Sequence, residues 1–190
     1  QSICDPARIL KTKEAILKFR GGDVYAGVGA GYTPCDGPPM EMIFDLDHRL
    51  RKLGIRKKAR LHYITDKAHL LPPGGPPVWD YLEKLFKKRN IQVTQNYELE
   101  KLEAKYLYFK GGETRPYDLC LLIPPYRGIN ALKDSGLTET RGFIPVNTAT
   151  MRAEKSRHYN IYAVGDAAGI PGPKQGHLAL MQAGIAAAHL

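Results

Sequence analysis

Apolar and polar positions follow a regular order along the first half of the chain. Short, continuously apolar runs, of which Val24–Val28 is the first, are typical of strands buried on both faces. Segments with apolar residues three and four positions apart predict helices. Strands are therefore expected near 23–28, 60–65 and 91–94, and helices near 8–19, 40–53 and 78–89. Strands and helices that alternate in this way favour an α/β fold with a parallel sheet and right-handed crossovers.

The pattern changes after residue 97. Two short segments, 98–104 and 105–109, are followed by Gly111-Gly112 and predict a β-meander with a glycine turn. Two further strands are expected at 117–123, which ends at a Pro-Pro pair, and at 142–146. A last buried strand is expected at 160–164, and a helix rich in alanine and leucine is expected from about His177 to Leu190.

The segment from the last strand to this helix predicts a site for a nucleotide-like ligand. Asp166 directly follows the strand and can accept hydrogen bonds from sugar-chain hydroxyls. A loop of small residues, 169–176, leads into the helix, whose first N–H groups favour a partly anionic group. The alternative is an ordinary strand–turn–helix unit in which Asp166 caps the helix.

The turn after the first strand departs from the usual dinucleotide-binding loop. Its glycines alternate with other residues over 27–31 instead of following Gly-x-Gly-x-x-Gly, and the turn continues as far as Pro39. Prolines donate no N–H to a phosphate, so this Rossmann-like domain is expected to have lost tight NAD(P) binding. The turn presents Cys35 instead. Asp66, after the second strand, either binds a ribose or caps a turn.

Charge and composition narrow the function classes. The 190 residues carry 28 Lys and Arg against 19 Asp and Glu, a formal net charge of +9. The basic residues are concentrated in 49–60 and 84–89. Such clusters are typical of a solvated helix face, of a surface attracted to an anionic membrane, or of a nucleic-acid binding surface. No nucleic-acid binding motif accompanies them. No apolar run approaches about 18 residues, so no transmembrane helix is expected, and no signal peptide is visible.

The cysteines and histidines indicate chemistry without a metal. Three cysteines, an odd number, form no secreted-type framework, which favours an intracellular location. Cys120 lies in an apolar strand and is expected to be structural. Cys35 precedes a helix start, where partial positive charge favours a thiolate; the alternative is a buried turn cysteine. Six histidines show no ligand spacing, so no metal site is expected.

Four segments, taken in order, resemble the sulfide:quinone oxidoreductase family and the related flavocytochrome c sulfide dehydrogenases. They are Gln-Ser-Ile-Cys at 1–4, Cys-Asp-Gly-Pro-Pro-Met-Glu at 35–41, Ile-Pro-Pro-Tyr-Arg-Gly at 123–128 and Val-Gly-Asp at 164–166. The last also resembles the second FAD-binding motif of flavoproteins with two dinucleotide domains. The family's N-terminal glycine-rich FAD turn, downstream redox cysteine, quinone pocket and membrane-anchoring helices have no match, so the chain is expected to be an inactive internal to C-terminal fragment.

The resemblance implies a domain plan. Residues 1–21 would be a linker or part of the FAD domain, and 22–112 a second Rossmann-like domain of the NAD type. Residues 113–190 would be the truncated C-terminal part of the FAD-binding domain. The expected fold is therefore a Rossmann-like parallel sheet with flanking helices and a β-meander, plus part of a second FAD-binding Rossmann-like domain.

The resemblance also implies a cofactor, partners and catalytic residues. FAD would be the cofactor and sulfide and quinone the small-molecule partners, without nucleic acid, and peripheral membrane attachment stays open for the complete protein. Cys35 would carry sulfur as a persulfide or polysulfide while electrons enter FAD, and Cys4 matches another family cysteine near the flavin. Glu41 would be an acid or base near the flavin or a proton carrier for quinone; otherwise it is a first-turn charge that suits the helix dipole.

Five residues are the expected contacts of FAD, namely Pro125, Gly165, Asp166, Lys174 and Gln175. Lys174 would stabilise negative charge on the reduced flavin, and its alternative is a solvated loop lysine. Two other functions stay open. One is an NAD(P)H-dependent pyridine nucleotide-disulfide oxidoreductase or type II NADH dehydrogenase, which the distorted glycine turn and the missing Cys-x-x-x-x-Cys pair disfavour. The other is a non-catalytic Rossmann-like binding module.

Overall fold

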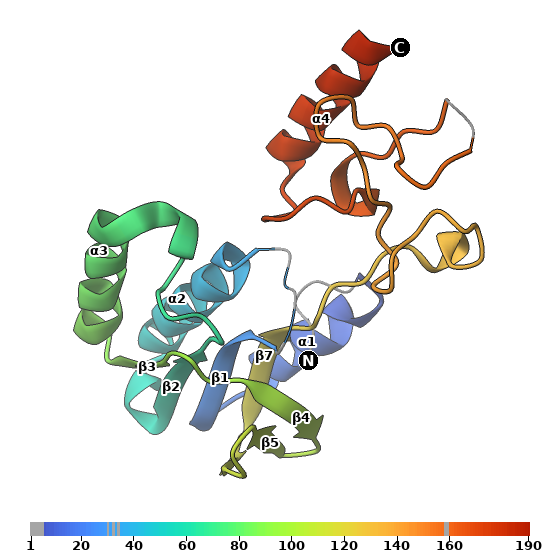
Figure 1. The fold of residues 1–190 in the computed structure, drawn as a ribbon. Coiled ribbons are helices and arrows are strands. Elements are labelled where there is room, and N and C mark those ends of the chain that lie inside the picture. Colours follow the sequence, from blue (N-terminus) through green and yellow to red (C-terminus); the bar gives the residue numbers. More distant parts are fainter. Residues whose placement is uncertain (1–5, 30, 32, 34, 158–159) are drawn as a thin grey trace. The chain divides into compact units, whose positions relative to one another are not determined.

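The chain forms two compact units, Gln1–Pro125 and Tyr126–Leu190, in the computed structural model (Figure 1). The structure describes residues 6–29, 31, 33, 35–157 and 160–190. Cys4 lies outside these residues, so its expected role stays a prediction.

A four-stranded parallel sheet forms the centre of the first unit, in the order β3-β2-β1-β7 (Figure 1). The strands are β1 (Gly22–Val28), β2 (Ala59–Ile64), β3 (Ile91–Thr94) and β7 (Leu119–Ile123). The helices are α1 (Ile9–Lys18), α2 (Gly37–Lys52) and α3 (Gly75–Lys88). The predicted α/β fold and parallel sheet are thus confirmed. β7 pairs with β1 and belongs to the first unit, although it lies beyond the boundary expected at residue 112.

Both faces of the sheet are covered, which explains the continuously apolar strands. On one face, Val24 and Ala26 of β1 pack with residues of α1, α2 and α3. On the other face, Tyr25 packs with residues of an antiparallel sheet. That sheet is the predicted meander, formed by β4 (Leu99–Glu103), β5 (Tyr106–Phe109) and β6 (Thr114–Pro116) in this order.

Two helices begin earlier than the apolar spacing predicts. Helix α2 begins at Gly37 and α3 at Gly75, and each has prolines in its first turn. Proline suits this position because the first N–H groups of a helix have no partner within it. Single 3-10 turns complete the unit at Pro6–Arg8, Arg56–Lys58 and Pro72–Gly74.

One buried carboxylate joins the ends of α2 and α3. Asp47, with a fully buried side chain, accepts hydrogen bonds from Arg51 Nε at 2.9 Å, Arg56 Nε at 2.5 Å and Arg89 Nη1 at 3.2 Å. Arg56 also donates to the carbonyl oxygens of Arg89 and Asn90, at 3.1 and 2.7 Å. These bonds hold together the end of α2, the Arg56–Lys58 turn and the segment after α3, which lie at the edge where β2 and β3 begin.

The second unit consists of loops, isolated bridges and one long helix, α4 (Gly176–His189). The strands predicted at 142–146 and 160–164 are wrong, because these segments form only single bridges with different partners among the described residues. Asp166 lies in a 3-10 turn, Gly165–Ala167, and another such turn spans Asn130–Leu132. No helix in the described part of the chain is long and apolar enough to span a bilayer.

Gly27 marks a close approach between β1 and β2. Its φ is +151°, and a Cβ there would lie 1.9 Å from the carbonyl oxygen of Ile64. We expect Gly27→Ala to lower the free energy of unfolding by about 3 kcal/mol or more, because backbone must move to relieve the clash.

Gly54 provides the matched control. Its φ is also positive, at +68°, but a Cβ would meet nothing within 4 Å. Gly54→Ala should cost only about 1 kcal/mol, from backbone strain alone. Urea unfolding of both variants measures the difference, and equal losses would show that the Gly27 contact relaxes freely.

Candidate functional site

The predicted site residues fall into two groups, one in each unit. Those of the first unit are Cys35, Glu41 and Pro125, and those of the second are Gly165, Asp166, Lys174 and Gln175.

Cys35 lies just before α2, at the carboxyl edge of the parallel sheet, and is half-buried. A Cβ on Gly37, the first residue of α2, would lie 3.6 Å from the Cys35 Sγ atom. The thiol therefore lies against the start of the helix, as the sequence predicts.

A buried tyrosine from β2 lies beside this turn. The hydroxyl of Tyr63 donates to the carbonyl oxygen of Asp36 at 3.4 Å, and its side chain is fully buried. Burial raises the pKa of Tyr63 well above its ordinary value, and the neighbouring charges of Asp36, Cys35 and Asp66 raise it further. Tyr63 thus offers a neutral hydrogen-bond donor next to the cysteine turn.

Two carboxyl groups complete this cluster. Burial raises the pKa of Asp36, which Lys67 opposes and Asp66 reinforces; the Thr33 hydroxyl, at 3.5 Å, lowers it slightly. One oxygen of Asp66 pairs with Lys67 Nζ at 3.1 Å. The other, Oδ1, is buried and has no hydrogen-bond partner among the described residues. The Asp36 carboxyl therefore keeps its proton to a higher pH than an exposed aspartate does, because burial raises its pKa.

Sequence reasoning missed Asp36 and Tyr63. A usable signal existed, since Asp36 directly follows Cys35 and precedes the helix. Tyr63 lies near the end of the neighbouring strand and Asp66 just after it, and the carboxyl ends of parallel strands meet at one edge of the sheet.

Pro125 and Glu41 occupy different places in the first unit. Gly29 N–H donates to the carbonyl oxygen of Ile123 at 2.8 Å, and a Cβ on Gly31 would lie 3.8 Å from the Pro125 Cβ. Pro125 therefore lies against the glycine turn. Glu41 is exposed on α2. Their expected roles stay predictions.

Lys174 stabilises the Gly165–Ala168 turn in the second unit by hydrogen bonds to its backbone. Its Nζ donates to the carbonyl oxygens of Gly165, at 3.3 Å, and Ala168, and lies 4.8 Å from the ring centroid of Phe143. Burial lowers the pKa of Lys174; Asp166 raises it in part, and Arg141 lowers it further. Lys174 is half-buried with backbone partners, which differs from a solvated loop lysine.

Gly165 and Asp166 face different surroundings. Gly165 has a φ of +61°, donates its N–H to Gln182 Oε1 of α4 at 2.7 Å, and would place a Cβ 3.2 Å from that of Ala179.

Asp166 is exposed, and one of its oxygens accepts a hydrogen bond from the Tyr126 hydroxyl at 3.0 Å. Gln175, not Asp166, is the N-cap residue of α4, and its side chain makes no cap hydrogen bond. The carboxylate is therefore accessible to a ligand.

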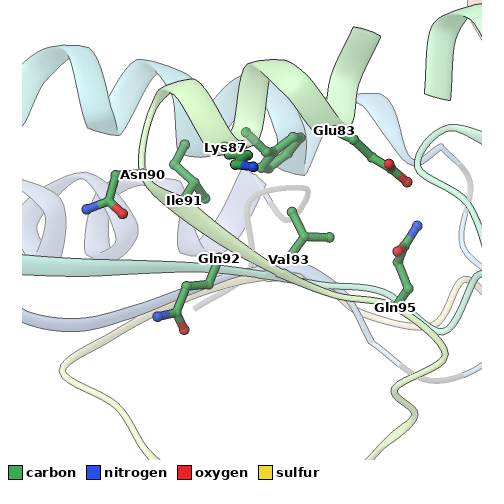
Figure 2. A pocket seen from close by; sticks show the side chains of 8 residues that line it. Glu83, Lys87, Asn90, Ile91, Gln92, Val93 and Gln95 are labelled. Atoms are coloured by element: carbon green, nitrogen blue, oxygen red, sulfur yellow. The ribbon is translucent and has the colours of Figure 1, made fainter. Parts of the chain in front are cut away.

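A separate cavity of about 410 Å³ lies between α3 and the edge strand β3 (Figure 2). Figure 2 shows Ile91 and Val93 between the strand and the helix, with Glu83 and Lys87 on the helix side. None of the predicted site residues lines it. Among the described residues no group of three or more His, Cys, Asp or Glu could hold a metal ion.

Comparisons with known proteins give a family and a fold. Residues 7–187 match the profile of the family described as pyridine nucleotide-disulphide oxidoreductase. The mitochondrial sulfide:quinone oxidoreductase of Mus musculus is 26% identical over 183 residues, which is 92% of this chain and 40% of that protein. The chain thus spans about two fifths of the length of this curated relative.

Solved structures show the same fold at lower identity. The sulfide:quinone oxidoreductase of Aquifex aeolicus matches 100% of this chain and 48% of its own, with a TM-score of 0.82 and 24% identity. The water-forming NADH oxidase from Lactobacillus brevis, bound to NADH, matches 98% of this chain and 40% of its own, with a TM-score of 0.64 and 17% identity.

The raised pKa of Asp36 predicts a pH-dependent stability. A carboxyl group with a raised pKa in the folded state binds its proton more tightly there than in the unfolded chain. The Asp36 carboxyl therefore adds to the free energy of unfolding of the wild type at low pH. This contribution is complete below the pKa of the unfolded chain, about 3.9, and is lost as pH rises through the pKa of the folded state. Asn does not titrate. We expect Asp36→Asn to become more stable relative to wild type between about pH 4 and 8.

Chemical denaturation at several pH values measures this trend. Asp45→Asn, on the exposed side of α2, is the control for the change in net charge. A difference between Asp36→Asn and wild type that stays constant with pH would contradict the expectation.

Proposed function

The chain belongs to the pyridine nucleotide-disulphide oxidoreductase family, and we propose that it is part of an FAD-dependent enzyme that oxidises sulfide and passes the electrons to a quinone. The main support is the position of Cys35, a half-buried thiol at the start of α2 and at the carboxyl edge of a parallel sheet. The likeness to proteins named as sulfide:quinone oxidoreductases covers nearly the whole chain and adds to this support.

Residues of the second unit fit one part of FAD. Asp166 offers an exposed carboxylate, oriented by Tyr126, to the hydroxyls of a ribityl chain. The first turn of α4 has N–H groups that the Gln175 side chain does not cap, and these suit a partly anionic group. Lys174 shapes the turn that carries Asp166. When bound, FAD would accept the two electrons that sulfide loses.

Cys35 would carry the sulfur. Its thiol and hydrogen sulfide join as a persulfide, an S–S bond replaces two S–H bonds, and two protons and two electrons leave. Asp36, whose pKa is raised by burial, can hold one of these protons, and the neutral Tyr63 hydroxyl can support the turn. Cys4 would be a second sulfur-carrying cysteine, and Glu41 an acid or base on the exposed side of α2.

NADH oxidation is the second candidate function. Asp66 supports it, since it lies just after β2, where a ribose-binding carboxylate is expected, and one of its oxygens is buried without a hydrogen-bond partner among the described residues. However, Pro38 and Pro39 remove N–H donors from the first turn of α2. These features disfavour a pyrophosphate, so sulfide is the preferred electron donor.

Flavin absorbance of the complete protein separates the candidates. Bleaching by sulfide and not by NADH supports the proposal, and bleaching by NADH alone overturns it. Absence of flavin absorbance would instead favour a non-catalytic binding module.

Cys35→Ser provides the sharpest test of the sulfur chemistry. In the complete protein we expect this variant to lose sulfide-dependent quinone reduction by on the order of 100-fold or more, with flavin still bound, because a hydroxyl forms no persulfide.

Cys120→Ser is the matched control. Cys120 is buried in β7, and burial raises its pKa to about 12, which keeps the thiol protonated. Its replacement should cost about 1–3 kcal/mol of stability and leave the turnover of folded enzyme unchanged. Near-normal turnover in Cys35→Ser would refute the thiolate mechanism and leave only the family assignment.

A further inference from the structure

Strand β3 lies at the side of the parallel sheet, and β2 is its one strand neighbour in the described part of the chain. Natural edge strands are commonly protected against pairing with another chain by a lysine, a proline or a bulge. All four residues of β3 are described, Ile-Gln-Val-Thr, and none of them is charged or a proline. Three of them are β-branched, which favours strands. The open side of β3 is therefore suited to accept a further strand.

The backbone groups of β3 point alternately to β2 and to this open side. The carbonyl oxygen of Thr94 accepts a hydrogen bond from the Thr65 N–H at 3.0 Å, so the backbone of Thr94 faces β2. In a strand of a parallel sheet, the N–H and C=O of one residue point to one side and those of the next residue to the other side. The N–H and C=O of Val93, and those of Ile91, therefore point away from β2.

The cavity of about 410 Å³ runs along the same strand, between β3 and α3 (Figure 2). Ile91 and Val93 point toward the helix, whereas Gln92 points to the other face of the strand (Figure 2). The remaining strand-side lining is formed by the neutral amides of Asn90 and Gln95. Neutral amides beside an apolar strip suit a neighbouring strand, which offers backbone amides and side chains in the same alternation.

Two charged residues of opposite sign line the cavity, and they lie one helical turn apart on α3. Glu83 and Lys87 are both exposed, and neither forms an ion pair within the described part of the chain. When a two-fold axis relates two copies, each copy presents the same patch in reverse order. Glu83 of each copy then lies across from Lys87 of the other. The surface is thus complementary to itself in charge.

We propose that β3 pairs with β3 of a second copy of this chain, antiparallel about a two-fold axis through Val93. The pairing joins the two parallel sheets into one continuous sheet and places the two α3 helices antiparallel on the same face. The order of charge at Glu83 and Lys87 favours a second copy over a foreign segment, because only the copy must carry the matching reversed order. The proposal goes beyond the sulfide chemistry and does not depend on it.

Reversal of these two charges tests the proposal, with the dissociation constant of the dimer measured by analytical ultracentrifugation over a concentration series. Glu83→Lys and Lys87→Glu should each weaken the dimer on the order of tenfold, because each replaces two opposite-charge contacts by two like-charge contacts. The double variant Glu83→Lys, Lys87→Glu restores opposite charges across the axis. We expect its dissociation constant to lie within about threefold of the wild-type value.

Val93→Pro tests the strand pairing itself. The Val93 N–H points away from β2, so proline leaves the bonds to β2 in place but removes a donor at the centre of the contact. We expect this variant to be monomeric at concentrations where the wild type is a dimer. Circular dichroism checks that all variants fold.

Lys88→Glu is the matched control, because it makes the same change of charge at a neighbouring residue that does not line the cavity. It should retain the wild-type dissociation constant. A monomeric wild type, equal weakening by Lys87→Glu and Lys88→Glu, or a double variant as weak as the single variants overturns the proposal. So does a dimer that the β3 and α3 variants leave unchanged and that Leu180→Ser with Met181→Ser abolishes, since the contact would then lie at the exposed apolar residues of α4.

Discussion

The orientation of α2 depends on one buried ion cluster. Asp47 is fully excluded from water, and burial alone would raise its pKa, yet Arg51 and Arg56 outweigh this effect and hold the pKa below its ordinary value. A buried carboxylate is tolerated only when its partners are placed well, which makes the cluster specific for one arrangement. Because Asp47 fixes one end of α2, the other end presents Cys35 at a defined place on the sheet.

The two edges of the parallel sheet carry different chemical groups because of this arrangement. Helix starts, with their partial positive charge, face the carboxyl edge and carry Cys35, whereas helix ends face the opposite edge and carry cations. A chemical site and a charged surface can thus coexist in one small unit. Two carboxyl groups gather near the turn that carries Cys35, since Asp66 lies close enough to Asp36 to raise its pKa, although the whole chain has a net charge of +9.

The pattern of apolar residues predicts the first unit because its strands are buried on both faces and its helices on one. The same reasoning fails at 142–146 and 160–164, where apolar content indicates burial but not a neighbouring strand. The apolar spacing begins α2 and α3 about three residues late, because the prolines of their first turns carry no apolar periodicity although they suit that position. Gly27 looks like a phosphate-binding glycine in the sequence, but the contact with the Ile64 carbonyl requires it for packing.

The candidate site was only partly predictable. Cys35 before a helix is a local feature, so the sequence places it. The hydroxyl of Tyr63 contacts the carbonyl oxygen of Asp36, which lies 27 residues away in the sequence. This contact depends on the register of β1 and β2, and a local sequence pattern does not reveal that register. Lys174 is ambiguous in the sequence, since a loop lysine and a lysine that fastens a turn have the same neighbours; only the carbonyl oxygens of Gly165 and Ala168 separate the two.

The strand order also affects how the chain is made. β1 lies between β2 and β7, and β7 begins only at Leu119, so on the ribosome the central strand gains its second neighbour long after its own synthesis. Until then its apolar residues and unpaired backbone groups are open on one side, which is the condition under which strands associate wrongly. The antiparallel meander is synthesised within this interval and, if formed early, can cover one face of β1 while the strand awaits its partner.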